Sequence, residues 1–152
     1  MACIRHDSMV EVVNSDGISL RAATDLRIGD VLNDPLVIGR TNVVEKVIVE
    51  SAPRVDLYFL FGLHCAGPQL VLHNGMWARV EQLSAIHPGS RAQCRDVSMV
   101  GLVLRGSCTI RVDGVICRGL RKLEWEAAHL DYVAVTLSLK GSSFRKSFKD
   151  GS

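Results

Sequence analysis

The sequence predicts a mainly β fold, a horseshoe or sandwich of short strands with one or two short helices. Short runs of alternating apolar and polar residues predict strands, because successive side chains of a strand point to opposite faces. Gly, Asn, Asp and Pro mark turns between these runs at intervals of about 8–12 residues. No long helices alternate with the strands, which disfavours a parallel α/β sheet. The expected strands are residues 9–13, 18–22, 31–32, 42–51, 54–63, 69–73, 76–80, 97–104, 108–112 and 132–139.

Asp113–Gly114 marks a turn after the predicted strand 108–112. Two other turns lie between predicted strands and carry a strong hairpin signal: Asp-Gly at the end of the segment 14–17, and Asn74–Gly75. Asn and Gly tolerate the positive φ angles that tight two-residue hairpins require, and Asp does so to a lesser extent. The two turns between predicted strands therefore predict antiparallel hairpins.

Other segments predict short helices and a break. Residues 24–27 read as one helical turn that the Thr24 hydroxyl caps. Ala52–Pro53 is expected to separate the two longest strand runs, since proline cannot donate a backbone hydrogen bond. Residues 81–93 read as a short helix or loop, and residues 120–129 have a helical pattern of apolar side chains.

Length and composition predict one globular domain. The chain has 152 residues, of which 47% are hydrophobic and 22% charged, enough to bury a core of ordinary size. We expect residues 1–152 to form a single domain, with the segment after about residue 145 as a candidate disordered tail.

Several function classes are disfavoured. The formal net charge is only +2 and the basic residues are scattered, which gives nucleic-acid binding little electrostatic support. The longest apolar run, residues 57–63, is far too short to span a membrane. No signal peptide is visible, so we expect a cytoplasmic monomer.

The cysteines do not predict a disulfide framework or a zinc site. There are five of them, an odd number without a C-x-x-C pair. Cys65, Cys108 and Cys117 are expected as small buried hydrophobes. No metal, nucleotide or other cofactor is implied.

The beginning of the chain carries the most chemistry. Cys3 places a thiol where it could attack the peptide bond that precedes it, Ala2–Cys3. Ser8 and Val10 follow, then the first hairpin, and then Gly29–Asp30 as a tight turn into the next strand.

In this order the segment resembles the first motif of the Hint (hedgehog/intein) superfamily. Residues 70–83, with Trp77 after the Asn-Gly turn, are similar to the second half of that family's next motif. Working back from Trp77, the family's T-x-x-H positions fall on Ala66 and Gln69. Residues 134–144 resemble a third motif, in which Thr136 replaces an aspartate and Ser142–Ser143 replace the family's His-Asn pair.

The resemblance implies a set of site residues. Cys3 would be the nucleophile of an N-to-S acyl shift, and Ser8 occupies a position that is usually Thr or Ser. Gln69 can hold a carbonyl group but cannot deliver a proton at neutral pH. His64 and His73 are candidate replacements for the missing histidine, although the spacing of His73 favours an exposed strand residue. The candidate catalytic residues are therefore Cys3, Ser8, His64 and Gln69.

Two functions remain open. The first is self-processing, in which the chain's own preceding polypeptide moves to Cys3 and is released by water or an external nucleophile. Splicing is not expected, because the terminal asparagine is missing. The second is an inactive Hint-fold module with a structural or partner-binding role. The sequence therefore does not decide whether the chain has single-turnover autoproteolytic activity. An engineered or truncated chain would also explain the departures from the motifs.

Overall fold

The structure is a computed structural model that describes residues 3–86 and 90–127. The chain divides into two compact units, Met1–Arg121 and Lys122–Ser152. The first unit contains the whole β-sheet. In the second unit, the described residues 122–127 are helical. The predicted strand at 132–139, the third motif and the tail lie outside the described residues.

The first unit confirms the mainly β prediction. Its twelve described strands form one sheet, in the order β12-β9-β1-β6-β5-β4-β2-β10-β11-β7-β8, with β3 paired to β2. The strands are β1 (Ile4–Arg5), β2 (Met9–Asn14), β3 (Gly17–Ala22), β4 (Val31–Asn33), β5 (Thr41–Leu60), β6 (Leu63–Ala66), β7 (Leu70–His73), β8 (Met76–Arg79), β9 (Ser90–Arg105), β10 (Thr109–Val112), β11 (Val115–Arg118) and β12 (Leu120–Arg121).

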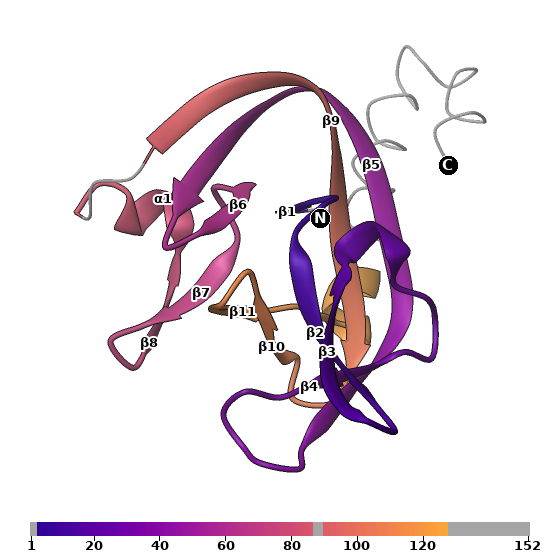
Figure 1. The fold of residues 1–152 in the computed structure, drawn as a ribbon. Helices are drawn as coiled ribbons and strands as arrows, with labels where there is room; N and C mark the ends of the chain where they lie inside the picture. The colour runs from indigo at the N-terminus through magenta and orange to yellow at the C-terminus, as the bar shows by residue number, and fades with distance from the viewer. Residues whose placement is uncertain (1–2, 87–89, 128–152) are drawn as a thin grey trace. The chain divides into compact units, whose positions relative to one another are not determined.

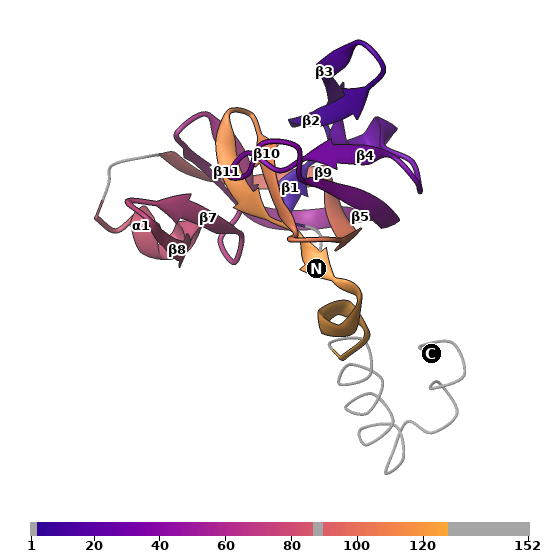
Figure 2. The same ribbon diagram turned by 90° about the horizontal axis from the view of Figure 1, so that it is seen from below.

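A long ribbon of β5 and β9 organises this sheet. The two strands pair from Val43–Arg105 to Phe59–Ser90 and arch over the rest of the unit (Figure 1). β6 pairs with one end of β5, and β1 lies between β6 and β9. Figures 1 and 2 both show β7 and β8 on one side of the unit and β2 and β3 on the other. The first described strand, β1, therefore lies inside the sheet and not at its edge.

The predicted break at Ala52–Pro53 is wrong. The ladder continues on both sides of Pro53, with Ala52 opposite Val97 and Arg54 opposite Arg95. Between those pairs Pro53 lies opposite Asp96, whose φ is +54°. The ladder tolerates the missing N–H because only one pair is lost.

The chain reverses instead at Phe61–Gly62, within the run predicted as the strand 54–63. These residues have φ angles of +57° and +96°, the left-handed conformation of a tight two-residue hairpin. Phenylalanine is an unusual residue there, which is why no turn was predicted.

The two predicted hairpins are confirmed, because β2 pairs with β3 and β7 with β8, each antiparallel. The predicted turn at Asp113–Gly114 also closes an antiparallel hairpin, between β10 and β11, and β11 was not among the predicted strands. Positive φ angles occur at both residues of Asn74–Gly75 and of Asp113–Gly114. The turn residues thus adopt the conformation for which their side chains are suited.

The helices follow the predictions only in part. A 3₁₀ helix spans Ala23–Asp25, but the residue before it is Ala22 and no side chain caps it, so the Thr24 cap is wrong because Thr24 lies inside the helix. Helix α1 (Val80–Leu83) occupies the start of the predicted helix or loop. The last residues of the predicted segment 81–93 instead belong to β9, which begins at Ser90. In the predicted helix 120–129, the first two residues form β12.

Aliphatic side chains from nearly every strand form the core. Val10, Leu32 and Val100 are fully buried. Cys65, Cys108 and Cys117 are buried, as predicted. Within residues 3–86 and 90–127, no helix is long and apolar enough to cross a membrane.

Candidate functional site

Hydrogen bonds to two different strands hold the backbone of Cys3. Its N–H donates to the Val100 carbonyl of β9 at 3.1 Å, and its own carbonyl accepts from the Ala66 N–H of β6 at 2.7 Å. In a regular antiparallel strand, the N–H and C=O of one residue bond to the same neighbour. The backbone at Cys3 therefore departs from the ladder at the nitrogen of the predicted scissile bond.

The turn after β6 brings the second motif to Cys3. Ala66 contacts Cys3 directly, and its carbonyl accepts from the Gln69 N–H at 3.1 Å. The buried Gln69 side chain donates to the carbonyls of Leu70 at 2.9 Å and Arg118 at 3.0 Å. Both amide hydrogens therefore tie the turn to neighbouring backbone.

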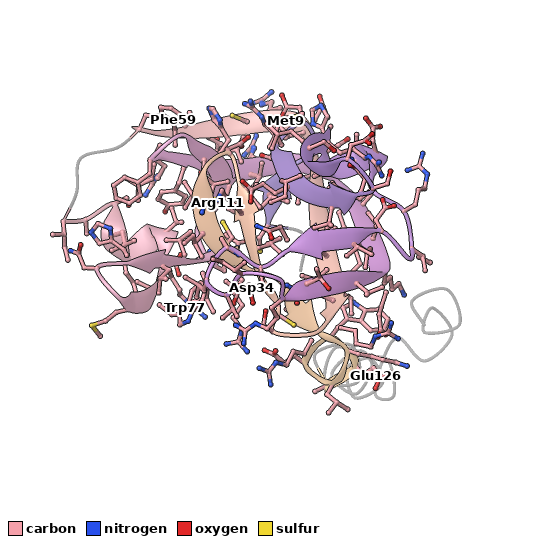
Figure 3. All side chains as sticks on the ribbon, turned by 60° about the horizontal axis from the view of Figure 1, so that its bottom comes forward. Met9, Asp34, Phe59, Trp77, Arg111 and Glu126 are labelled. Carbon is pink, nitrogen blue, oxygen red and sulfur yellow. The ribbon has the colours of Figure 1, made fainter. Side chains whose placement is uncertain are left out.

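His64 lies on β6, two residues before Ala66, but its ring packs towards β5. The ring centroids of His64 and Phe59 are 4.5 Å apart, and Phe59 lies at the margin of the ribbon in Figure 3. Burial and the nearby Arg5 guanidinium lower the pKa of His64. Its imidazole is therefore neutral at pH 7. Among the described residues, no hydrogen bond joins His64 to Cys3.

His73 is less exposed than predicted. It ends β7 beside the Asn74–Gly75 turn and is half-buried. Its ring stacks on Phe61 with centroids 5.1 Å apart and an angle of 14° between the planes. Phe61, in the turn between β5 and β6, covers the His73 ring. The position of His73 in its strand gives no sign of this contact between distant segments.

Ser8 faces the core. It continues the alternation of the buried Val10 and Val12, and only 3% of its surface is exposed. Within the described part of the chain, its Oγ atom has no hydrogen-bond partner. No contact in the described residues links this hydroxyl to Cys3.

Replacing Ser8 with alanine is expected to raise the free energy of unfolding by about 1 kcal/mol, because it removes a buried hydroxyl without a partner. Urea denaturation of Ser8→Ala measures the change. Ser107→Ala is the matched control, since the Ser107 Oγ donates to Asp34 at 2.6 Å; this variant should lose stability. A loss in Ser8→Ala would show that a water molecule or another group satisfies the hydroxyl.

The thiols differ in reactivity. Burial raises the pKa of Cys65 to about 12, and burial also raises the pKa of Cys117. Cys3 is half-buried; burial raises its pKa, and the Glu50 carboxylate acts in the same direction. A thiol attacks as its thiolate, so Cys3 reacts slowly at neutral pH in this arrangement.

The Val100 carbonyl also belongs to the site, and no sequence motif pointed to it. It lies in an ordinary strand run, and only the pairing of β9 with β1 brings it to Cys3. In the described ranges, no cluster of three His, Cys, Asp or Glu residues is arranged to hold a metal ion.

No family model matches this sequence, and no curated protein matches it. Solved structures do match its fold. The DnaB intein from Synechocystis sp. PCC 6803 has a TM-score of 0.59 and 12% identity, covering 78% of this chain and 99% of that chain. The gp41-1 intein has a TM-score of 0.56 and 8% identity, with 78% and 99% covered.

A bacterial intein-like domain from Clostridium thermocellum gives a similar result. It has a TM-score of 0.56 and 11% identity, covering 78% of this chain and 99% of that chain. This chain therefore has the Hint fold of inteins and intein-like domains, as the order of its sequence motifs predicted.

Proposed function

We propose that this domain cleaves the peptide bond before Cys3 by an N-to-S acyl shift. The observation that carries the proposal is the backbone of Cys3, held by Val100 and Ala66 beside the turn that ends at Gln69. The Hint fold of the chain supports it.

The reaction has two steps. The Cys3 thiolate attacks the carbonyl carbon of Ala2, and the C–N bond breaks to leave a thioester and the free amine of Cys3, which takes up one proton. Water or an external thiol then attacks the thioester, which releases the preceding polypeptide and restores the Cys3 thiol. Cleavage ends there, because Ser142–Ser143 replace the His-Asn pair that asparagine cyclisation needs.

The residues around Cys3 have different roles in the reaction. The Val100 carbonyl orients the scissile amide through its N–H, and the same nitrogen can still donate to it as an amine after cleavage. Gln69 supplies no proton. The imidazolium form of His64, which is the minor form at pH 7 because its pKa is lowered, or a solvent molecule supplies it after a rearrangement that moves the ring from Phe59.

The second candidate is an inactive Hint-fold module that binds a partner. Both amide hydrogens of Gln69 donate to backbone carbonyls, so this side chain has no donor left for the scissile carbonyl. This arrangement favours the inactive module. The raised pKa of Cys3 points in the same direction.

A fusion with a small folded protein before Cys3 tests the proposal. Intact mass is followed with and without dithiothreitol for the unchanged chain, Cys3→Ala and Cys94→Ala. We expect thiol-dependent release that is absent in Cys3→Ala, since only Cys3 follows the scissile bond. Cys94→Ala is the matched control, because Cys94 is the other half-buried thiol; it should cleave at the unchanged rate.

An unchanged fusion that stays intact over days, while circular dichroism shows a folded domain, would overturn the cleavage proposal in favour of the binding module. Release that persists in Cys3→Ala would point to a contaminating protease or to spontaneous hydrolysis.

A further inference from the structure

The first part of β9 forms an open edge of the sheet. Within the described ranges, residues 90–97 pair with β5 alone, and β1 and β12 pair with β9 from Met99 onwards. In Figure 1 this part of β9 runs along the outer side of β5 in the arch. In an antiparallel ladder, successive residues direct their N–H and C=O groups alternately to the two sides of the strand. Residues 91–96 therefore present backbone donors and acceptors to a further strand.

The Ala92 carbonyl on this stretch has a weak partner. It accepts the thiol of Cys94, two residues further along the same strand, with a sulfur–oxygen distance of 3.8 Å. A thiol is a weak donor, so the backbone N–H of an added strand would be a stronger one. The edge thus holds an acceptor that strand addition would satisfy better.

The side chains along this edge carry positive charge on one face. Successive side chains of a strand alternate between its two faces, so Arg91, Gln93 and Arg95 point to the same side, and all three are exposed. Four residues of strand separate the two arginines by about 13 Å. On β5 the exposed Arg54 lies directly opposite Arg95. It places a third guanidinium group behind the edge.

These arginines keep their charge within the part of the chain that the structure describes. No ion pair there engages Arg54, Arg91 or Arg95. The guanidinium of Arg91 lies over the Tyr58 ring, 5.9 Å from its centroid. Such a contact orients the guanidinium group without neutralising it.

The acidic side chains of this part of the ribbon do not balance the arginines. Asp56 lies opposite Gln93 and therefore shares the face of the three guanidinium groups. Asp96 follows Arg95 directly, so its side chain points to the other face of β9. The face as a whole is therefore positively charged.

This charge restricts which strand the edge can accept. A second copy that paired antiparallel about Gln93 would bring Arg91 against Arg95, and like charges directly opposite each other destabilise a ladder. An acidic strand would instead place carboxylates beside both guanidinium groups, as charge-assisted hydrogen bonds require. The same arginines thus oppose self-association and favour an acidic partner.

We propose that residues 91–96 of β9 bind an extended acidic segment of a partner protein. The segment adds to the sheet as a further strand and carries two acidic residues four positions apart, opposite Arg91 and Arg95. Ladder hydrogen bonds contribute affinity, and the two ion pairs select acidic segments over neutral ones. This inference goes beyond cleavage at Cys3 and holds whether or not Cys3 reacts.

Fluorescence polarisation with labelled peptides and the full chain tests the inference. The acidic probe alternates valine with polar residues and has two glutamates four positions apart. The neutral probe has glutamine in place of both glutamates. We expect the acidic probe to bind about tenfold more tightly than the neutral one, the usual scale for two exposed ion pairs. Its binding should weaken as salt is added.

The double variant Arg91→Gln, Arg95→Gln should bind the acidic probe about tenfold more weakly than the unchanged chain. The double variant Arg27→Gln, Arg79→Gln is the matched control. It removes the same charge from two exposed arginines outside β9 and should bind as the unchanged chain does. Equal binding by both double variants, or no preference for the acidic probe, would overturn the inference.

Charge reversal provides a second test. The variant Arg91→Glu, Arg95→Glu should prefer a probe with lysine in place of both glutamates. Circular dichroism confirms that each variant is folded. In the unchanged chain, the acidic probe should slow hydrogen exchange of the amides in residues 91–96. Exchange that stays unchanged would overturn strand addition.

Two further results would replace the acidic protein segment by another occupant. A single-stranded oligonucleotide of equal charge that competes as well as the acidic peptide would show a general polyanion site. A dimer of the unchanged chain in size-exclusion chromatography, dissociated by the acidic peptide, would show that a second copy occupies the edge.

Discussion

An Ala66→Thr, Gln69→His double variant is expected to release its N-terminal partner about 10²–10⁴ times faster than the unchanged chain, the usual contribution of a positioned general acid. The two substitutions restore the T-x-x-H residues that the motif alignment assigns to these positions. They would supply a group that titrates near neutral pH where an amide now stands.

The geometry explains why the gain is expected at position 69. The Ala66 N–H donates to the Cys3 carbonyl, and Gln69 closes the same turn. A histidine keeps one ring N–H for the carbonyl of Leu70 or Arg118, and its other nitrogen can carry the proton that the leaving amine needs. The loss of one of the two hydrogen bonds of Gln69 should lower stability by about 1 kcal/mol.

Intact mass of the fusion measures the gain, with two controls. Ala66→Thr alone should change the rate little, because threonine adds no general acid. Cys3→Ala in the double variant should abolish release. A folded double variant that cleaves no faster than the unchanged chain would contradict the view that the missing acid limits the reaction.

Local turn chemistry accounts for what could be predicted of the fold. Asn74–Gly75 and Asp113–Gly114 determine their hairpins because both residues of each pair adopt positive φ. The motif alignment singled out Ala66 and Gln69, and the turn that contains them lies beside Cys3. Signals of this kind depend only on residues that are close together in the sequence, so they can be recognised without the structure.

The features that were missed depend on contacts between distant segments. Pro53 lies inside a strand because the β5–β9 ladder continues on both sides of it. The first residues of β9 were not predicted because they are polar and exposed, so they lack apolar alternation. The Val100 carbonyl reaches Cys3 only through the pairing of β9 with β1. None of these arrangements leaves a local pattern.

The buried hydrogen-bond network around Asp34 also depends on contacts between distant segments. The Asp34 side chain is fully buried and bonds to Arg40. It also accepts from the Ser107 Oγ at 2.6 Å and from the Leu36 N–H at 2.8 Å. Figure 3 labels Asp34 beside β4. Asp34 thus fastens the loop before β5 to the turn after β9.

Asp34→Ala is expected to lower the free energy of unfolding by about 2–4 kcal/mol, because it leaves Ser107 and the Leu36 N–H without their acceptor. Arg40 is 48% exposed, so water can solvate its charge and the loss stays below that of a fully buried pair. Urea denaturation at pH 7 measures the change. Asp7→Ala is the matched control: Asp7 pairs with Arg5 at the surface, and such exposed pairs contribute about 1 kcal/mol or less.

The pH dependence gives an independent check on Asp34. Burial alone would raise its pKa, but the hydrogen bonds from Ser107 and Leu36 and the charge of Arg40 together lower it. A carboxyl whose pKa is lower in the folded state stabilises the fold above its unfolded pKa of about 3.9. That contribution disappears as the pH falls through the folded-state pKa. The unchanged chain should therefore lose stability steeply below about pH 4, whereas Asp34→Ala should lose less over the same interval. Parallel acid-unfolding curves would mean that Asp34 is protonated in the folded protein and that the network rests on neutral hydrogen bonds.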